Sequence, residues 1–124
     1  MNDYEFKMGV HLNETALPFE EAVGLAQELG ARYVEYSVPP EELTEKHAAY
    51  CKRILDDAGL QTHVVGCTPP PFKILHIDEV EHAELPTHSE FVRDLDNLRR
   101  SMAFGKFVGA PQAQCSGFAW PGEF

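Results

Sequence analysis

The chain has 124 residues, of which 44% are hydrophobic and 24% are charged, the proportions of one folded globular domain rather than of a disordered or fibrous protein. Twenty acidic residues against ten basic ones give a formal net charge of −10, so nucleic acid and anionic membrane surfaces are not expected partners. Because the sequence shows neither a membrane-spanning apolar stretch nor a basic, apolar leader, we expect a cytoplasmic protein.

The first predicted elements are a strand, a helix and a second strand. Residues 7–12 form a short apolar run that predicts the first strand. Pro18 suits a first helical turn, and Gly30 suits a helix end in the left-handed conformation. Between them one apolar helical face is predicted, made of Phe19, Ala22, Val23, Ala26 and Leu29. Residues 33–36 then have the aromatic and β-branched content of a strand.

The next helix and strand repeat this unit. Pro39 and Pro40 force a turn, and the two glutamates after them favour a helix N-terminus through the helix dipole. The predicted helix extends to a glycine stop at Gly59, and its apolar stripe consists of Leu43, His47, Tyr50, Cys51, Ile54, Leu55 and Ala58. Residues 60–67 follow directly and predict the third strand.

The last third of the chain begins with a long loop. Residues 68–86 contain three consecutive prolines and show no steady period, and long ordered loops in compact folds are usually functional. Thr87 and Glu90 have the spacing of a capping box for a third helix, ended by Gly109. Its apolar face is predicted to hold Phe91, Leu95, Leu98, Met102 and Val108. Residues 112–116 predict a fourth strand, and residues 117–124 a final loop.

The predicted order is therefore β-α-β-α-β-α-β, which favours a parallel sheet with right-handed crossovers. Periodicity alone leaves two architectures open. One is part of a (β/α)8 barrel, and the other is an open doubly wound sheet such as a flavodoxin-like domain, which a first strand inside the sheet would reveal.

Three segments taken together resemble the N-terminal half of the sugar phosphate isomerase/epimerase family. They are Phe19-Glu-Glu-Ala with Leu29-Gly-Ala-Arg-Tyr-Val-Glu-Tyr36, then Ile54-Leu-Asp-Asp-Ala-Gly-Leu60, and then Val108-Gly-Ala-Pro111, and the similarity extends over about residues 8–117. The resemblance implies an α/β fold, a partial (β/α)8 TIM barrel of the xylose isomerase-like type, with residues 1–124 as a single incomplete domain of about four parallel strands and three helices.

The resemblance also implies a chemistry. In the family a divalent metal (Mn, Mg or Zn) assists proton transfer next to a sugar carbonyl. The carboxylates and histidine that bind this metal come from later strands, so no catalytic residue carries over, and we expect no metal to bind this fragment alone. A complete barrel needs about 250 residues, and the present chain corresponds to the first four strands.

Three residues match positions at or beyond the carboxyl ends of the strands, where such barrels bind substrate. They are His11 after the first strand, Cys67 after the third and Trp120 in the final loop, which resembles an aromatic wall of a sugar pocket. The expected ligand is a sugar or sugar phosphate. Each residue also has a structural reading: His11 bonded to backbone, Cys67 as buried packing, and Trp120 as cover for exposed core.

For other chemically active side chains the sequence favours a structural role. Glu35 suits a pairing with a basic neighbour more than substrate orientation, and His63 suits a satisfied position within its strand. The set His76, Asp78, Glu81 and His82 has metal-binding donors without a known metal spacing. Three widely spaced cysteines without a Cys-x-x-Cys pair predict neither a disulfide framework nor structural zinc.

Two functional hypotheses follow. The first is an N-terminal fragment of a metal-dependent sugar (phosphate) isomerase/epimerase-like protein, inactive by itself. The second is a non-catalytic half-barrel that binds a small molecule and self-associates into a homo-oligomer through its open sheet edges. The sequence lacks a dinucleotide-binding glycine motif, a phosphate loop and a serine-hydrolase elbow, which weakens nucleotide-binding and hydrolase interpretations.

Overall fold

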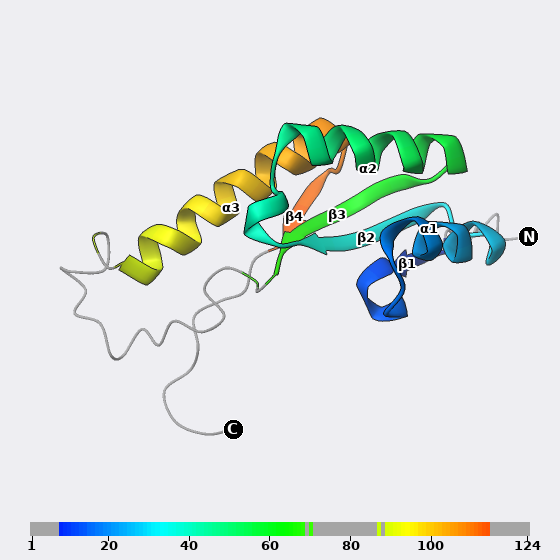
Figure 1. Cartoon of the computed structure of the whole chain (residues 1–124), viewed down its shortest axis with the longest axis horizontal. Coiled ribbons are helices and arrows are strands. Elements are labelled where there is room, and N and C mark those ends of the chain that lie inside the picture. Colours follow the sequence, from blue (N-terminus) through cyan, green and yellow to red (C-terminus); the bar gives the residue numbers. More distant parts are fainter. Residues whose placement is uncertain (1–7, 69, 71–86, 88, 115–124) are drawn as a thin grey trace, which may run out of the picture.

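The computed structural model describes residues 8–68, 70, 87 and 89–114 of the chain (Figure 1). It is an α/β fold in which strands and helices alternate. The elements are β1 (Gly9–His11), a 3₁₀ helix η1 (Leu12–Thr15), α1 (Phe19–Glu28), β2 (Tyr33–Val38), a 3₁₀ helix η2 (Pro40–Glu42), α2 (Glu45–Ala58), β3 (Gln61–Cys67), α3 (Ser89–Val108) and β4 (Gln112–Gln114).

The four strands form one parallel sheet in the order β1-β2-β3-β4, which confirms the predicted alternation. Each new strand is added beside the previous one on the same side. The first strand therefore lies at an edge of the described sheet, and a flavodoxin-like order with this strand inside is not observed. The described strands do not close on themselves, so the sheet has the strand order of a barrel without showing a closed one.

The helices form a single layer on one face of this sheet. Right-handed crossovers that always advance in one direction place every connecting helix on the same side. In agreement, α1 contacts α2 and α2 contacts α3. Tyr50 Oη on α2 donates a hydrogen bond of 2.8 Å to Glu20 on α1, and the ring of His47 on α2 lies 6.0 Å from that of Phe104 on α3. No described helix covers the opposite face, which we call the open face.

The core lies between the sheet and the helix layer. Along β2 every second side chain (Val34, Tyr36 and Val38) is buried under the helices, while the residues between them are half-buried on the open face. Tyr36 brings a hydroxyl into this core, where it forms a 3.1 Å hydrogen bond with Thr62, and burial raises the pKa of Tyr36 well above its ordinary value. The core is therefore mainly apolar, and the buried hydroxyl of Tyr36 has a hydrogen-bond partner.

The helix ends follow the predicted glycines closely. Gly30, Gly59 and Gly109 have φ angles of 78°, 72° and 82°, the left-handed conformation that stops each helix. The start of α2 was predicted too early, because the two prolines allow only a short 3₁₀ turn. The α-helix itself begins after Thr44, whose hydroxyl accepts a 3.2 Å hydrogen bond from the backbone N–H of His47.

Of the predicted inner face of α3, Val108 is buried and Phe91, Leu95 and Leu98 are half-buried, but the prediction is wrong for Met102. The residues that α3 buries are Asp94, Ser101, Phe104, Gly105 and Val108, whereas Met102 is 56% exposed. Small residues allow α3 to approach the sheet closely, because a Cβ added at Gly105 would lie only 3.9 Å from that of Val65 on β3. Ser101 remains compatible with burial because its hydroxyl donates a 2.8 Å hydrogen bond to the carbonyl of Asn97.

Smaller differences concern element ends. Leu29 was predicted on the inner face of α1 but follows the last helical residue and is 56% exposed. The first strand is shorter than predicted and the second extends two residues further, to Val38. Most of the predicted loop 68–86, the end of the predicted fourth strand and the final loop lie outside the described residues. Within the described part, no helix is long and apolar enough to cross a bilayer.

Candidate functional site

Two rows of register partners, most of them polar, cross the open face, one at the middle of the sheet and one near the carboxyl ends of the strands. In the first row His11, Glu35, Val64 and Gln112 are register partners on β1 to β4. In the second row Ser37, Gly66 and Gln114 are register partners on β2 to β4. Ligands of parallel α/β folds bind at the carboxyl ends of strands, so the second row and His11 at the end of β1 occupy the position where a site is expected.

Several polar groups in these rows have no protein partner. His11 Nδ1 is buried and makes no hydrogen bond. Among the described residues, no hydrogen bond or ion pair is formed by the side chains of Glu35, Ser37 or Gln114. An unsatisfied buried polar atom costs about 1–3 kcal/mol, so a nitrogen of this kind is suited to receive a water molecule or a ligand oxygen.

Gly66 allows the second row to form. A Cβ at this position would lie 3.2 Å from Ser37 Oγ and 3.2 Å from Gln114 Oε1. Both distances are shorter than ordinary van der Waals contacts, so a larger residue would push the two side chains apart. The absent side chain at Gly66 therefore lets two hydrogen-bonding oxygens converge on the middle of the open face.

Asn13 extends the first strand at the same end of the sheet. Its side-chain Oδ1 accepts a 2.8 Å hydrogen bond from the backbone N–H of Ser37, and its Nδ2 donates a 3.2 Å hydrogen bond to the carbonyl of Ser37. The amide thus replaces the backbone ladder where β1 has already ended. Sequence reasoning missed Asn13, Ser37 and Gln114, although the alternating pattern along residues 33–38 is the signal that places Ser37 beside Glu35.

The structure separates the sequence-predicted substrate residues. His11 lies on the open face beside Glu35, as its register shows. Cys67 is 1% exposed on the opposite face, where its thiol contacts Ser101 of α3, and burial raises its pKa. Trp120 and the set His76, Asp78, Glu81 and His82 lie outside the described residues. Among the predicted residues that the structure describes, only His11 therefore belongs to the polar rows.

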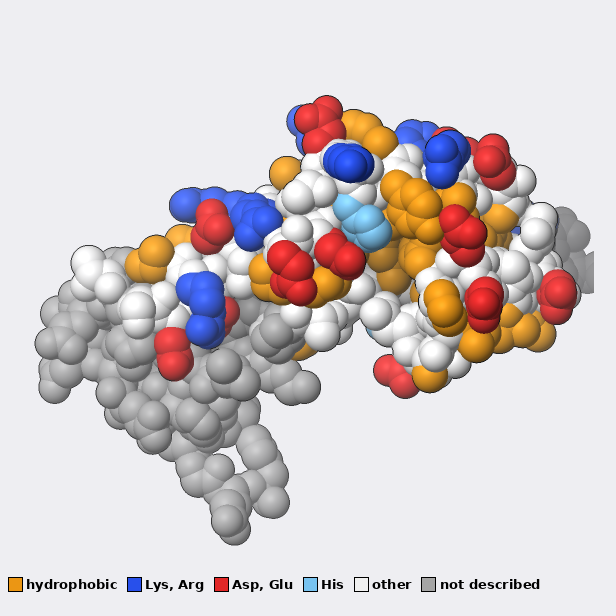
Figure 2. Space-filling view, viewed as in Figure 1, with side chains coloured by type: hydrophobic (Ala, Val, Ile, Leu, Met, Phe, Trp, Pro, Cys, Tyr) orange, Lys and Arg blue, Asp and Glu red, His pale blue; other side chains and the backbone are white. Residues whose placement is uncertain are grey.

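A cavity of about 390 Å³ lies on the helix side of the sheet, also toward the carboxyl ends of the strands. Its lining includes Glu42, His47 and Cys51. Figure 2 shows apolar side chains gathered between α1 and α2 in this region. His47 Nε2 is 3.5 Å from Cys51 Sγ and 3.8 Å from Glu42 Oε2. Because one nitrogen makes both contacts, the imidazole cannot relay a proton between the other two groups.

The thiol in that cavity is also unsuited to nucleophilic chemistry. Burial, followed by the nearby charge of Glu42, raises the pKa of Cys51 to about 12. A reactive cysteine needs a lowered pKa, so we interpret this cysteine as core packing. The described residues contain no cluster of three His, Cys, Asp or Glu side chains able to hold a metal ion.

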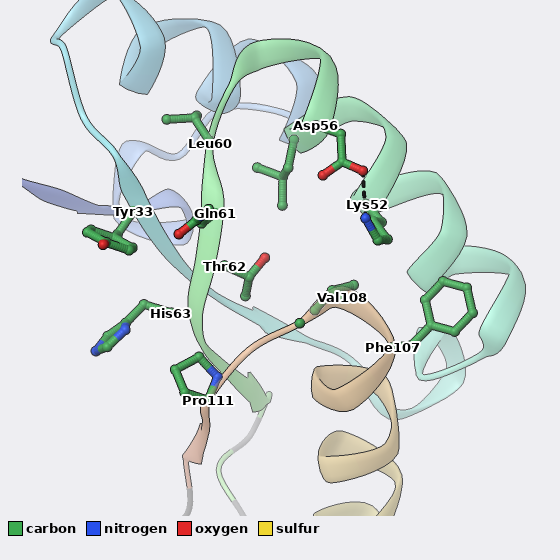
Figure 3. A pocket seen from close by; sticks show the side chains of 12 residues that line it. Tyr33, Lys52, Asp56, Leu60, Gln61, Thr62, His63, Phe107, Val108 and Pro111 are labelled. Carbon is green, nitrogen blue, oxygen red and sulfur yellow. Dashed lines mark hydrogen bonds and ion pairs between the residues drawn. The ribbon is translucent and has the colours of Figure 1, made fainter.

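Another cavity, of about 450 Å³, lies at the amino end of β3 (Figure 3). It is bounded by the C-terminal ends of α2 and α3, and Lys52 and Asp56 form a 2.6 Å ion pair at its rim. Conserved chemistry in parallel α/β barrels is found at the opposite end of the strands, and the amino end serves stability. This cavity is therefore not the preferred candidate.

No known protein-family model matches the chain, and no curated protein sequence does so either. The polar rows of the open face are the candidate site because His11, Ser37 and Gln114, and not a similarity to a known site, bring unengaged donors and acceptors to the carboxyl ends of β1, β2 and β4.

Proposed function

We propose that this chain forms the N-terminal half of a metal-dependent sugar (phosphate) isomerase/epimerase-like barrel, which in its full-length form transfers a proton next to a sugar carbonyl. The strand order supports this proposal. Four parallel strands added in one direction, with every helix on one face, match half of a (β/α)8 barrel, whose inner surface would be the open face.

The outer side of α3 supplies further support. A groove of about 500 Å³ runs between α3 and β4, and Met102, Gly105, Lys106, Ala110 and Ala113 line part of it. In a barrel the next helix of the ring packs at this position. An apolar groove with an exposed methionine is what such a helix would cover.

One observation carries the proposed activity: the unengaged polar groups at the carboxyl ends of the strands. The free Nδ1 of His11, the Ser37 hydroxyl and the Gln114 amide offer both donors and acceptors, which suits several hydroxyl groups of one sugar. The described strand residues of the open face include no Lys or Arg, so they fit hydroxyl groups better than a phosphate. In this proposal these residues bind and orient the sugar.

The described residues do not fit the divalent ion that the resemblance implies, because they hold no cluster of three metal-binding side chains. In the proposal that ion is held by the later strands of the full-length protein.

Sugar binding tests the proposal directly. Ligand-observed NMR with D-fructose should detect binding by the wild-type chain and a loss of affinity in His11→Ala. His63→Ala is the matched control, since this histidine also lies on the open face but nearer the amino ends of the strands. Equal binding by His11→Ala and the wild type would show that the polar rows do not bind the sugar.

Proton transfer is tested with the same ligand in D₂O containing Mn²⁺ or Mg²⁺. We expect no deuterium incorporation next to the sugar carbonyl by the purified chain alone. Clear turnover by the chain would contradict the assignment of catalysis to residues that it does not contain.

The open sheet edges favour a second candidate, a non-catalytic half-barrel that self-associates and binds a small molecule. Both β1 and β4 have only one partner among the described strands, and unpaired parallel edges are templates for pairing with another copy. Sedimentation discriminates between the candidates. A discrete dimer supports self-association, and a monomer that unfolds cooperatively contradicts it.

A further inference from the structure

The amino half of the open face contains a hollow of about 580 Å³, lined by Gly9, Tyr33, Glu35, His63 and Pro111. Tyr33, His63 and Pro111 also border the cavity at the amino end of β3. Four strands or their ends contribute to it, so it is a feature of the assembled sheet. Figure 3 shows Tyr33 and His63 together on the side of β3 away from Lys52 and Phe107.

A β-bulge turns His63 into this hollow. Val34 pairs with Thr62, but the next residue, Glu35, pairs with Val64, so His63 is the extra residue of β3. Its ring lies 5.7 Å from that of Tyr33, with an angle of 64° between the two planes. Bulges commonly re-aim a side chain near a functional site, and here the result is two aromatic rings that form a corner.

The third wall of the hollow is a carboxylate. Glu35 is half-buried, and in the described part of the chain it forms neither an ion pair nor a hydrogen bond through its side chain. No Lys or Arg lines the hollow. The whole chain carries a formal charge of −10, so cations are attracted to the protein and anions are repelled.

We propose that this hollow binds an alkylammonium ion, held between the aromatic corner of Tyr33 and His63 and the carboxylate of Glu35. Aromatic faces attract cations through their quadrupoles, and a nearby carboxylate adds charge complementarity. Gly9 lines the hollow without a side chain of its own. Glu35 belongs both to the first polar row and to this hollow, so the two candidate sites are neighbours that share one residue.

The test compares choline with its uncharged isostere dimethylbutanol, which has the same shape without the positive charge. Amide NMR titrations at about pH 8, above the usual titration range of histidine, report binding at residues 33, 35 and 63. We expect choline to bind the wild type about tenfold more tightly than the isostere, with about fivefold from the cation–π contact and about twofold from the charge of Glu35.

Two substitutions locate the interaction. Glu35→Gln removes the charge with little change in size and should weaken choline binding about twofold, with the isostere unaffected. Tyr33→Leu keeps an apolar wall without the quadrupole and should remove most of the remaining preference for choline. Glu28→Gln on the exposed end of α1 is the matched control, because it changes the net charge equally on the helix side of the sheet.

Three results would overturn the inference: no binding of choline, equal affinity for choline and its isostere, or equal weakening by Glu28→Gln and Glu35→Gln. The inference stands apart from the proposed sugar chemistry. Choline binding without fructose binding would refute only the proposed function, and the converse result would refute only the ammonium site.

Discussion

The side chain of Asn13 should be worth more to stability than its exposed position indicates. It makes two hydrogen bonds to the backbone of Ser37, at 2.8 Å and 3.2 Å, and so joins the loop after β1 to the carboxyl end of β2. Each such bond contributes about 0.5–1.5 kcal/mol net, and water replaces part of that at an exposed site. We therefore expect Asn13→Ala to lower the free energy of unfolding by about 1–2 kcal/mol.

Urea unfolding followed by circular dichroism measures this loss as a lower midpoint at an unchanged slope. Thermal unfolding should show a decrease in Tm of about 4–8 °C for a domain of this size. Asn13→Asp retains the oxygen that accepts the 2.8 Å bond but loses the donor, so its stability should lie between those of the wild type and Asn13→Ala.

Glu14→Ala is the matched control, because its side chain is exposed and forms no hydrogen bond in the described part of the chain. This neighbour should change stability by less than about 0.5 kcal/mol. If Asn13→Ala destabilises no more than Glu14→Ala, the amide of Asn13 does not hold the two strands together. That result would refute its role as a replacement for the backbone hydrogen bonds beyond the end of β1.

Three other expectations address the core, the glycine stops and the outer side of α3. The pKa of the Cys51 thiol is near 9 in the unfolded chain and about 12 in the folded protein. The buried neutral thiol therefore stabilises the fold fully below pH 9, and this contribution is lost as the pH rises from 9 toward 12. The stability difference between wild type and Cys51→Ala should therefore shrink by about 1 kcal/mol between pH 8 and pH 10, and a constant difference would contradict the burial effect. Gly59→Ala, at a φ of 72°, should destabilise by about 1 kcal/mol, whereas Gly24→Ala, which meets nothing within 4 Å inside α1, should stabilise by about 0.5–1 kcal/mol. Met102→Glu should leave the stability of a monomer within about 0.5 kcal/mol, and a loss of several kcal/mol would show that this side of α3 is packed.

Local chemistry made much of the fold predictable. The alternation of strands and helices follows from apolar periodicity, and the three helix stops follow from glycines that adopt positive φ at low cost. The inner face of α3 was not predictable in the same way. Hydrophobic periodicity favoured the stripe through Met102, but close packing on β3 favoured Ser101 and Gly105, and only the tertiary contacts decide between these faces.

The candidate site likewise contains residues whose position the sequence predicted and residues whose position only the structure shows. The position of His11 at the carboxyl end of the first strand was predictable, because parallel strands present their ends to one edge of the sheet. The structural packing role of Cys67 was one of two open readings, and the structure places this side chain under α3. The contribution of Ser37 and Gln114 depends on Gly66 lying between them, which is a property of strand pairing across the sheet.

The sequence by itself determined the order of the elements, the glycine stops of the helices and the class of fold, because these depend on interactions between residues a few positions apart. Only the tertiary structure decided the strand order, the one-sided helix layer and the bulge that turns His63 toward Tyr33. These features depend on register between strands whose paired residues are 24 to 48 positions apart in the chain, and no local pattern specifies that register to a single residue.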